Sequence, residues 1–318
     1  MPFNPEKFIE ESKKYIKEAI GAGKAIIALS GGVDSFTAAS LAAIAIPNQL
    51  FAVYVDTGLM RKNESRKVSE AAAKVGIKLK IINAAEKFFA ALKGIEDPEQ
   101  KRRRIGELFI RIFEEEAKKD KVTFLIQGTI APDWIESGGA GRDRIKSHHN
   151  VGALPEKMHL KLCEPLRELY KHEVREVCKK LGLPDYIYAR QPFPGPALAV
   201  RIVGEVTREK VKIVQEASAI TEEEIELAAK AKMIELPWQY FAGLLSSKAV
   251  GVRGDERAYQ YIVLIRAVRS LDGMTANFSQ MDWKVLQKIS TRITNEIKEV
   301  GRVVYDITHK PPGTIELE

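Results

Sequence analysis

The sequence predicts an α/β protein, with a parallel sheet covered by helices on both faces and a smaller α+β domain after it. Through the first half, short apolar segments alternate with longer amphipathic ones, as strands and helices do in a parallel sheet. Beyond a proline-rich stretch near residue 190, apolar segments follow one another directly. That second pattern is typical of strands joined as hairpins, with helices beside them.

In the first half, four short apolar runs predict strands buried on both faces, over 24–29, 51–55, 78–82 and 122–126. Apolar residues at helical spacing predict helices over 5–20, 36–45, from about 63, and over 86–92, 98–119 and 171–180. The stretch from about 129 to 155 is glycine-rich and polar and breaks this alternation. A long irregular segment within a compact domain is typical of an active-site lid, and we expect one here.

Three closely spaced prolines mark the expected domain boundary, because proline continues neither a helix nor a central strand. We therefore predict a first domain over 1–190, a stiff connector over 191–200 and a second domain over 201–318. Within and after the connector, the pattern predicts strands at 198–203, 238–250, 259–268 and 303–307. Helices are expected at 208–230 and 283–298.

Composition narrows the class of protein only moderately. The 318 residues carry 50 Lys and Arg against 43 Asp and Glu, a net charge of +7. This surplus suits phosphate-bearing partners from nucleotides to RNA, but it also fits an ordinary lysine-rich surface. No apolar run approaches the roughly 20 residues that cross a bilayer, and the N-terminus does not resemble a signal peptide. We expect a cytoplasmic protein without a membrane partner.

The two cysteines predict neither a metal site nor a redox pair. Cys163 and Cys178 are too far apart in sequence for a CxxC motif. Both stand among apolar residues, Cys163 in an expected strand and Cys178 in an expected helix. We interpret both as small core residues.

The clearest chemical signal is a loop of serine, glycine and aspartate directly after the first strand. Glycine lets backbone N–H groups turn inward toward phosphate oxygens without obstruction by Cβ atoms. The loop ends at the N-terminus of the next helix, where the helix dipole favours an anion. We expect it to contact ATP or pyrophosphate through Ser30, Gly31, Gly32, Val33, Asp34 and Ser35. The alternative is a polar turn that only caps the helix.

Two carboxylates near this loop have open roles. Asp34 is the only carboxylate within the loop and could orient it or hold Mg²⁺. Asp56 ends the second strand, at the sheet edge where open α/β folds bind ligands. It could hold a ribose or a metal-bound water, or it could cap the following turn. A Walker A motif is not formed, because Gly21-Ala22-Gly23-Lys24 precedes the strand and lacks the serine or threonine.

The loop resembles the signature of the PP-loop ATP-pyrophosphatases, which cleave ATP between its α- and β-phosphates. Other segments, spread over both expected domains, are similar to the GMP synthetases. They are residues 127–129, 132–138, 145–152, 164–169, 171–175, 192–196, 252–255, 302–307 and 310–316. Ala131 departs from the pattern, since some relatives carry a larger or charged residue there.

The resemblance implies a carbon–nitrogen ligase of GMP biosynthesis that uses ATP and Mg²⁺. The enzyme would adenylate XMP at its C2 oxygen, and ammonia would then displace AMP. Lys146 in the lid and Asp34 are the candidate catalytic residues. We expect Lys146 to reach the phosphates or the intermediate, the alternative being a solvated surface lysine, and the roles of His148 and His149 stay open. Gly128 joins the implied ATP contacts. The implied XMP contacts are Pro194, Gly195, Pro196, Asp255, Lys310, Ile315 and Glu316.

The resemblance also implies partners. Many GMP synthetases carry an N-terminal glutamine amidotransferase domain, but this sequence starts at the synthetase part. We therefore expect ammonia from a separate glutaminase subunit, and a homodimer formed through the second domain. No nucleic acid is expected. Two other hypotheses stay open: an RNA-modifying PP-loop enzyme, and a non-catalytic nucleotide-binding subunit.

Overall fold

The computed structural model describes residues 3–131, 160–254, 256–271 and 273–318, with Arg253 described by its backbone alone. The chain divides into two compact units. The first unit comprises Met1–Asp56, Asn63–Ala84 and Gly106–Arg190. The second comprises Thr57–Lys62, Ala85–Ile105 and Gln191–Glu318. Each unit thus takes its residues from separate stretches of the chain.

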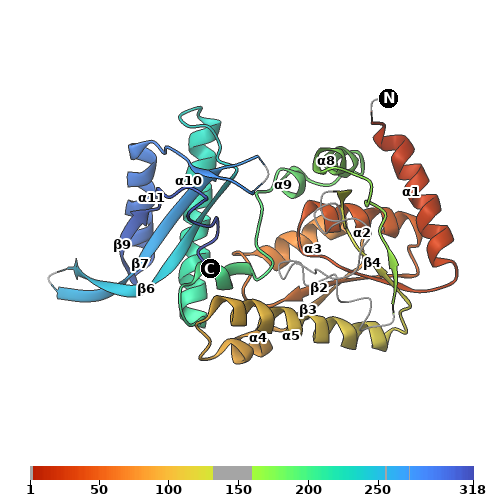
Figure 1. Cartoon of the computed structure of the whole chain (residues 1–318), viewed down its shortest axis with the longest axis horizontal. Coiled ribbons are helices and arrows are strands. Elements are labelled where there is room, and N and C mark those ends of the chain that lie inside the picture. Colours follow the sequence, from red (N-terminus) through yellow and green to blue (C-terminus); the bar gives the residue numbers. More distant parts are fainter. Residues whose placement is uncertain (1–2, 132–159, 255, 272) are drawn as a thin grey trace. The chain divides into compact units, whose positions relative to one another are not determined.

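The first unit is built on a five-stranded sheet, which confirms the predicted fold class (Figure 1). Its strands are β1 (Ala25–Ala28), β2 (Leu50–Asp56), β3 (Leu79–Asn83), β4 (Phe124–Ile126) and β5 (Lys161–Cys163). They lie in the order β3-β2-β1-β4-β5, and every pairing is parallel. The central strand β1 is almost wholly buried, as expected for a strand covered on both faces.

Helices cover both faces of this sheet. They are α1 (Pro5–Ile20), α2 (Val33–Ala45), α3 (Glu64–Lys74) and the C-terminal part of α5 (Pro98–Lys119). Helix α8 (Lys171–Lys180) packs on α1 and α2, and the short α9 (Asp185–Tyr188) packs on α2 and α8. Figure 1 shows α2 and α3 on one side of the sheet and α5 along the other. Helix α2 is rich in alanine, serine and threonine and is buried along most of its length, because such small side chains allow close packing.

The strand order creates a reversal beside β1. From β1 the chain winds outward through β2 to β3, and it then returns to place β4 on the other side of β1. The strand that follows β1 therefore lies on one side of it, and the strand that follows β4 lies on the other. In open α/β sheets, ligands bind in the crevice at such a switch point.

The second unit contains α4 (Ala85–Leu92), the N-terminal part of α5 and a four-stranded sheet. Strands β6 (Gln239–Arg253) and β7 (Glu256–Arg269) form a long antiparallel hairpin. Strand β8 (Asn277–Phe278) pairs antiparallel with β7, and β9 (Val300–Tyr305) pairs parallel with it. Helices α10 (Arg208–Lys230) and α11 (Trp283–Glu296) pack on this sheet. None of the helices that the structure describes is long and apolar enough to cross a membrane.

One predicted strand is wrong. Residues 198–203 were expected to be extended, but Ala197–Arg201 form a short 3₁₀ helix, and only Ile202 makes an isolated bridge to Leu244. The five helical residues are all buried. A short buried apolar run fits a strand or a helix equally well, so its pattern could not distinguish the two.

Candidate functional site

The loop after β1 brings its hydroxyl groups together at the start of α2. Ser30 Oγ and Ser35 Oγ lie 3.1 Å apart. Gly32 N–H donates to Ser30 Oγ at 3.3 Å, and Ser35 Oγ donates to the Gly32 carbonyl at 3.0 Å. Gly32 is the N-cap of α2 and offers no side chain to the first amides of the helix. Hydroxyl donors and the N-terminus of a helix therefore meet at one place, an arrangement that favours an anion.

Gly128 brings the segment after β4 against the backbone of this loop. A Cβ atom at Gly128 would lie 2.9 Å from the carbonyl carbon and oxygen of Asp34 and 3.1 Å from Ser35 N. None of these contacts could be relieved by rotating a side chain, because all of them involve backbone. Only glycine allows this approach, and the two segments meet at the switch point of the sheet.

Asp34 is paired on one of its oxygens only. Oδ2 accepts a hydrogen bond from Lys171 Nζ at 2.5 Å, within an ion pair. Oδ1 is buried and has no hydrogen-bond partner among the described residues. Buried carboxylate oxygens ordinarily have partners. An unpartnered oxygen of this kind is a hard ligand that suits Mg²⁺.

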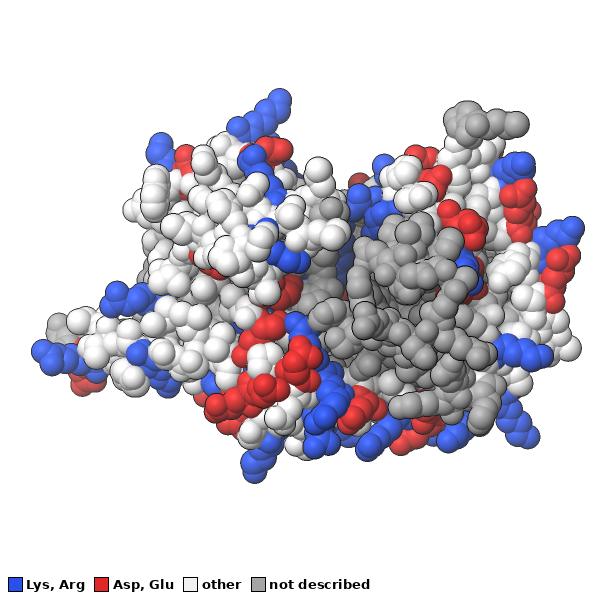
Figure 2. Space-filling model, viewed as in Figure 1, with Lys and Arg blue, Asp and Glu red and all other residues white. Residues whose placement is uncertain are grey.

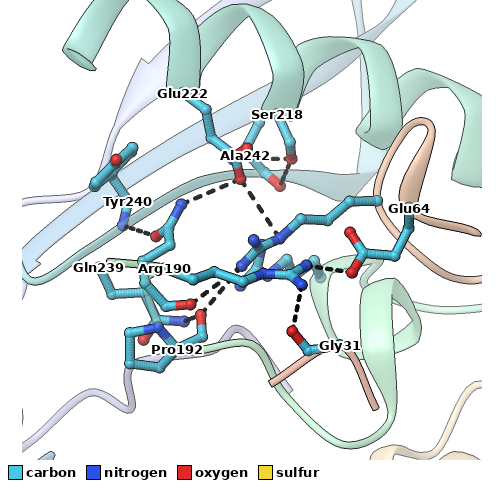
Figure 3. A network of polar contacts seen from close by, with 12 residues as sticks. Gly31, Glu64, Arg190, Pro192, Ser218, Glu222, Gln239, Tyr240 and Ala242 are labelled. Atoms are coloured by element: carbon cyan, nitrogen blue, oxygen red, sulfur yellow. Dashed lines mark hydrogen bonds and ion pairs between the residues drawn. The ribbon is translucent and has the colours of Figure 1, made fainter. Parts of the chain in front are cut away.

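Arg190 holds the loop from its other side. Its Nη1 donates to the Gly31 carbonyl at 2.8 Å, and its Nη2 lies 2.5 Å from Oε1 of Glu64 (Figure 3). Glu64 opens α3 and is only 3% exposed. Gly31 has a φ of +83°, and a Cβ atom there would lie 2.7 Å from Glu64 Oε1. The loop conformation is thus fixed by glycine geometry and by a buried ion pair.

Asp56 stands at the carboxyl end of β2, as predicted. Its Oδ2 accepts a hydrogen bond from Ser65 Oγ at 2.5 Å, and its backbone carbonyl accepts one from Ala84 N at 2.8 Å. The carboxylate is therefore tied to the first turn of α3. Its contact with a nucleotide stays a prediction.

In the second unit, the candidate XMP residue Glu316 already has strong partners. It accepts hydrogen bonds from Arg201 Nε at 2.8 Å and Nη2 at 3.0 Å, and from Gln239 Nε2 at 2.7 Å. Arg201 is fully buried, and its guanidinium lies 4.0 Å from the ring centroid of Phe241 and 5.1 Å from that of Phe193. The bidentate pair and the flanking rings hold the Glu316 carboxylate in one orientation.

The segment before Glu316 is held mainly through its backbone. Arg266, 1% exposed, donates to the carbonyls of Thr308, Thr314 and Ile315 and to the Asp306 carboxylate. Lys310 Nζ donates to the Gly273 carbonyl at 2.7 Å. The segment from Asp306 to Glu316 is therefore ordered by charged hydrogen bonds, unlike a typical frayed end.

The other predicted residues divide into two groups. In the connector, Pro194 O accepts a hydrogen bond from Ala197 N at 3.0 Å, so that Pro194, Gly195 and Pro196 form a turn before the 3₁₀ helix. The expected lid residues Lys146, His148 and His149, and the expected XMP contact Asp255, lie outside the described residues.

Several structurally central residues were missed by sequence reasoning. They are Glu64, Lys171, Arg190, Arg201, Gln239 and Arg266. Lys171 did fall within a segment that resembles the GMP synthetases, but its pairing with Asp34 across 137 positions left no local signal. The others lie in ordinary helix, strand or connector sequence. Ala131 is buried, 4% exposed, and donates its N–H to the Leu169 carbonyl.

The two cysteines are core residues, as predicted. Cys163 and Cys178 are both fully buried, and burial raises the pKa of each thiol to about 11, so both are protonated core residues. On the face shown in Figure 2, basic and acidic side chains are interspersed over the described residues, and no continuous basic surface is visible among them.

Comparisons with known proteins place these features in a family. A family model described as PP-loop domain matches residues 5–187, and one described as GMP synthase C terminal domain matches residues 223–317. A protein of Thermococcus kodakarensis, named as one subunit of a GMP synthase (glutamine-hydrolyzing), is 61% identical over 314 residues, covering 98% of this chain and 99% of that protein. A protein of Pyrococcus abyssi with the same name is 59% identical, covering 99% and 100%.

A longer relative matches over the same region. A GMP synthase (glutamine-hydrolyzing) from Thermotoga petrophila is 55% identical over 313 residues, covering 98% of this chain but only 62% of that protein. The similarity therefore extends over both units of this chain in each of the three relatives.

Proposed function

The chain belongs to the GMP synthase family, among relatives named as one subunit of that enzyme, and from this premise we propose that it converts XMP, ATP and ammonia into GMP, AMP and pyrophosphate. It is an ATP-using carbon–nitrogen ligase. The observation that carries the proposal is the loop after β1, where hydroxyls, helix N-terminus and the Gly128 backbone converge at the switch point. Such a loop suits the pyrophosphate part of ATP.

The proposed chemistry follows from the leaving group. Oxygen at C2 of xanthine leaves poorly, so it first attacks the α-phosphorus of ATP, and the bond from that phosphorus to the bridging oxygen breaks. Pyrophosphate departs, and the C2 oxygen now carries the adenylyl group. Ammonia then adds at C2 and expels AMP, with the loss of a proton from the nitrogen. Positioning and charge stabilisation supply most of the catalysis in such a reaction.

The residues of the first unit have distinct proposed roles. Ser30, Ser35 and the backbone of Gly31, Gly32 and Val33 bind the departing pyrophosphate. Asp34 Oδ1, which has no hydrogen-bond partner among the described residues, would hold Mg²⁺ beside the phosphates. When bound, Mg²⁺ neutralises charge that develops on phosphate oxygens. Lys146 is proposed as the cation that reaches the phosphates, and Asp56 and Gly128 as further nucleotide contacts.

The second unit is proposed to bind XMP. Pro194, Gly195, Pro196 and Asp255 are proposed contacts, together with the C-terminal residues Lys310, Ile315 and Glu316. Lys310 can pair with the 5′-phosphate. A Lys310→Ala variant is expected to raise the KM for XMP more than the KM for ATP; the reverse ratio would contradict this assignment.

Ammonia is proposed to come from a separate glutaminase subunit. The relatives from Thermococcus kodakarensis and Pyrococcus abyssi are matched over nearly their full length, and their name makes each of them one subunit of a glutamine-hydrolysing enzyme. We also propose that the second domain, 201–318, forms a homodimer. Sedimentation of the purified chain tests this proposal. A monomer at micromolar concentration would contradict it.

The decisive assay combines the purified chain with ATP, Mg²⁺ and XMP, and varies the nitrogen source. With ammonium, we expect GMP, AMP and pyrophosphate in equal amounts. With glutamine we expect no GMP until a glutaminase subunit is added. Absence of pyrophosphate release with ammonium would contradict the proposed reaction, and GMP formation from glutamine by this chain alone would contradict the separate glutaminase.

A further inference from the structure

We propose that Arg190, fixed by Glu64, is a positioning residue that sets the Gly31–Gly32 peptide so that Gly32 N–H faces the pyrophosphate. The inference rests on the proposed function, because it presupposes that pyrophosphate binds in the loop. All three partners, Arg190, Glu64 and the loop, belong to the first unit.

The contact between Arg190 and the loop is made to a backbone carbonyl. Nη1 of Arg190 donates to Gly31 O at 2.8 Å, a normal length for a charged hydrogen bond (Figure 3). The arginine side chain is 15% exposed, so solvent competes little for this bond. The interaction therefore acts on the conformation of the loop itself.

The geometry of the peptide bond passes this constraint on to the next residue. In a planar trans peptide, the carbonyl and the following N–H point in opposite directions. With the Gly31 carbonyl held toward Arg190, Gly32 N–H must point away from it. That N–H lies on the side of Ser30 Oγ, to which it donates at 3.3 Å, and Ser35 Oγ is 3.1 Å from the same hydroxyl. The amide therefore lies on the side of the loop where the two hydroxyl groups meet, and its acceptor in this structure is Ser30 Oγ.

Gly31 would otherwise leave this peptide loosely defined. Its φ of +83° is open to glycine, which has many alternative conformations. A Cβ atom would lie 2.7 Å from Glu64 Oε1 and 2.9 Å from Arg190 Nη1, so a larger residue would displace this pair and also strain the backbone at its positive φ. Glycine by itself does not restrict the backbone at this position. The Arg190–Glu64 pair restricts it instead.

Glu64 has two effects on Arg190. Its carboxylate, almost fully buried, fixes the second arm of the guanidinium at 2.5 Å. It also neutralises a cation that would otherwise attract phosphate directly and compete with the loop amides. Arginine suits this place because its rigid fork presents separate nitrogens to the carboxylate and the carbonyl in a fixed planar geometry, whereas a lysine offers one flexible ammonium group.

The test measures ligand binding and turnover in Arg190→Ala, Arg190→Lys and Glu64→Gln. The binding probes are inorganic pyrophosphate and AMP, each titrated calorimetrically with Mg²⁺ present. Arg66→Ala is the matched control, because Arg66 lies on α3 beside Glu64 but its pair with Glu70 is exposed, 69% and 56%. Thermal unfolding of every variant shows whether it is folded at the assay temperature.

In Arg190→Ala we expect pyrophosphate affinity and kcat to fall about tenfold or more, with AMP affinity and the KM for XMP unchanged. Arg190→Lys should recover part of the loss, and Glu64→Gln should show a smaller loss than Arg190→Ala. Arg66→Ala should behave as the unaltered chain.

Two results would overturn the inference. The first is unchanged pyrophosphate affinity in folded Arg190→Ala. The second is an equal loss for pyrophosphate and AMP that tracks a lowered unfolding temperature, which would mark Arg190 as a purely structural residue. Failure of the unaltered chain to bind or release pyrophosphate would instead contradict the proposed function, so the two failures are distinguishable.

Discussion

The loop at 30–35 and the segment at 306–316 are both ordered, but by different means. The loop is shaped by glycines and backbone contacts, with close approaches at Gly31 and Gly128. The C-terminal segment is held by two buried arginines, Arg201 and Arg266, that bind carboxylates and carbonyls. The loop thus depends on steric fit in addition to the Arg190–Glu64 pair, whereas the C-terminal segment depends on charged hydrogen bonds.

This difference decides how each site should respond to change. A glycine that contacts backbone cannot be enlarged without moving the loop, whatever the solvent conditions. A buried guanidinium needs all of its partners, because leaving one charge uncompensated is costly. We therefore expect an added methyl group to be the most damaging change in the first site, more so than loss of the Arg190 charge, and charge removal to be the most damaging change in the second.

The largest expected effect comes from Gly128→Ala. The added Cβ atom would meet the Asp34 backbone at 2.9 Å and displace the loop, and a misplacement of about 1 Å can lower turnover about a hundredfold. Pyrophosphate release with saturating XMP and ammonium measures this. The control is Gly76→Ala, where φ is +71° but nothing lies within 4 Å. It should lose about 1 kcal/mol of stability and keep its activity. Full activity of Gly128→Ala would contradict the steric account.

The second effect is expected from Arg266→Leu. Loss of the arginine removes the hydrogen-bond donors to the carbonyls of Thr308, Thr314 and Ile315. It also leaves the Asp306 carboxylate without its cation. We expect the free energy of unfolding to fall by about 3–5 kcal/mol. The KM for XMP should rise, whereas pyrophosphate binding should be retained. Denaturant unfolding and steady-state kinetics measure the two effects.

Its matched control is Arg269→Ala, on the same strand, where Arg269 pairs with Glu235 and both are largely exposed. That variant should lie within about 1 kcal/mol of the unaltered chain. Equal losses in the two variants would show that burial of the arginine is unimportant, contrary to the comparison.

The smallest expected effect is on the pH dependence of the free energy of unfolding. It can be measured for each unit, because Glu116 lies in the first unit and Glu224 in the second. Burial by itself raises the pKa of both glutamates. Hydrogen bonds from Lys119 and Lys80 outweigh this effect at Glu116 and hold its pKa below 4.5. Hydrogen bonds from Lys288 and Arg292 do the same at Glu224. Their stabilisation is therefore present above the unfolded pKa and is lost as pH falls through the folded pKa.

Glu116→Gln and Glu224→Gln should each lose on the order of 1 kcal/mol at neutral pH and show a weaker loss of stability below about pH 4.5. Unfolding curves between pH 3 and pH 7 measure this, with Glu70→Gln, on the surface of α3, as the control. If both variants lost stability below pH 4.5 as steeply as the unaltered chain does, these ion pairs would contribute nothing to the pH dependence of stability.

The sequence predicted the loop well because its determinants are contiguous. Residues 30–35 show their glycines, hydroxyls and position between strand and helix directly, and the apolar runs at 24–29 and 51–55 identified buried parallel strands. Gly128 was also identified, although its reason, the close approach to Asp34, required the fold.

The supports of both sites could not be predicted, since they join distant positions. Arg190 contacts Gly31 across 159 positions, and Arg201 contacts Glu316 across 115. Nothing local distinguishes such a residue from any other charged one. The strand predicted at 198–203 was wrong for another reason. Residues that are buried on all sides show no apolar periodicity that could distinguish a strand from a helix.

The central claim is that XMP accepts the adenylyl group at its C2 oxygen while ATP is cleaved between the α- and β-phosphates. It is tested most directly with XMP labelled with oxygen-18 at C2, incubated with the chain, ATP, Mg²⁺ and ammonium. The account predicts that the label appears in the phosphate of AMP, one atom for each GMP formed, and that pyrophosphate stays unlabelled. Label in pyrophosphate or inorganic phosphate, or AMP without label, would contradict it.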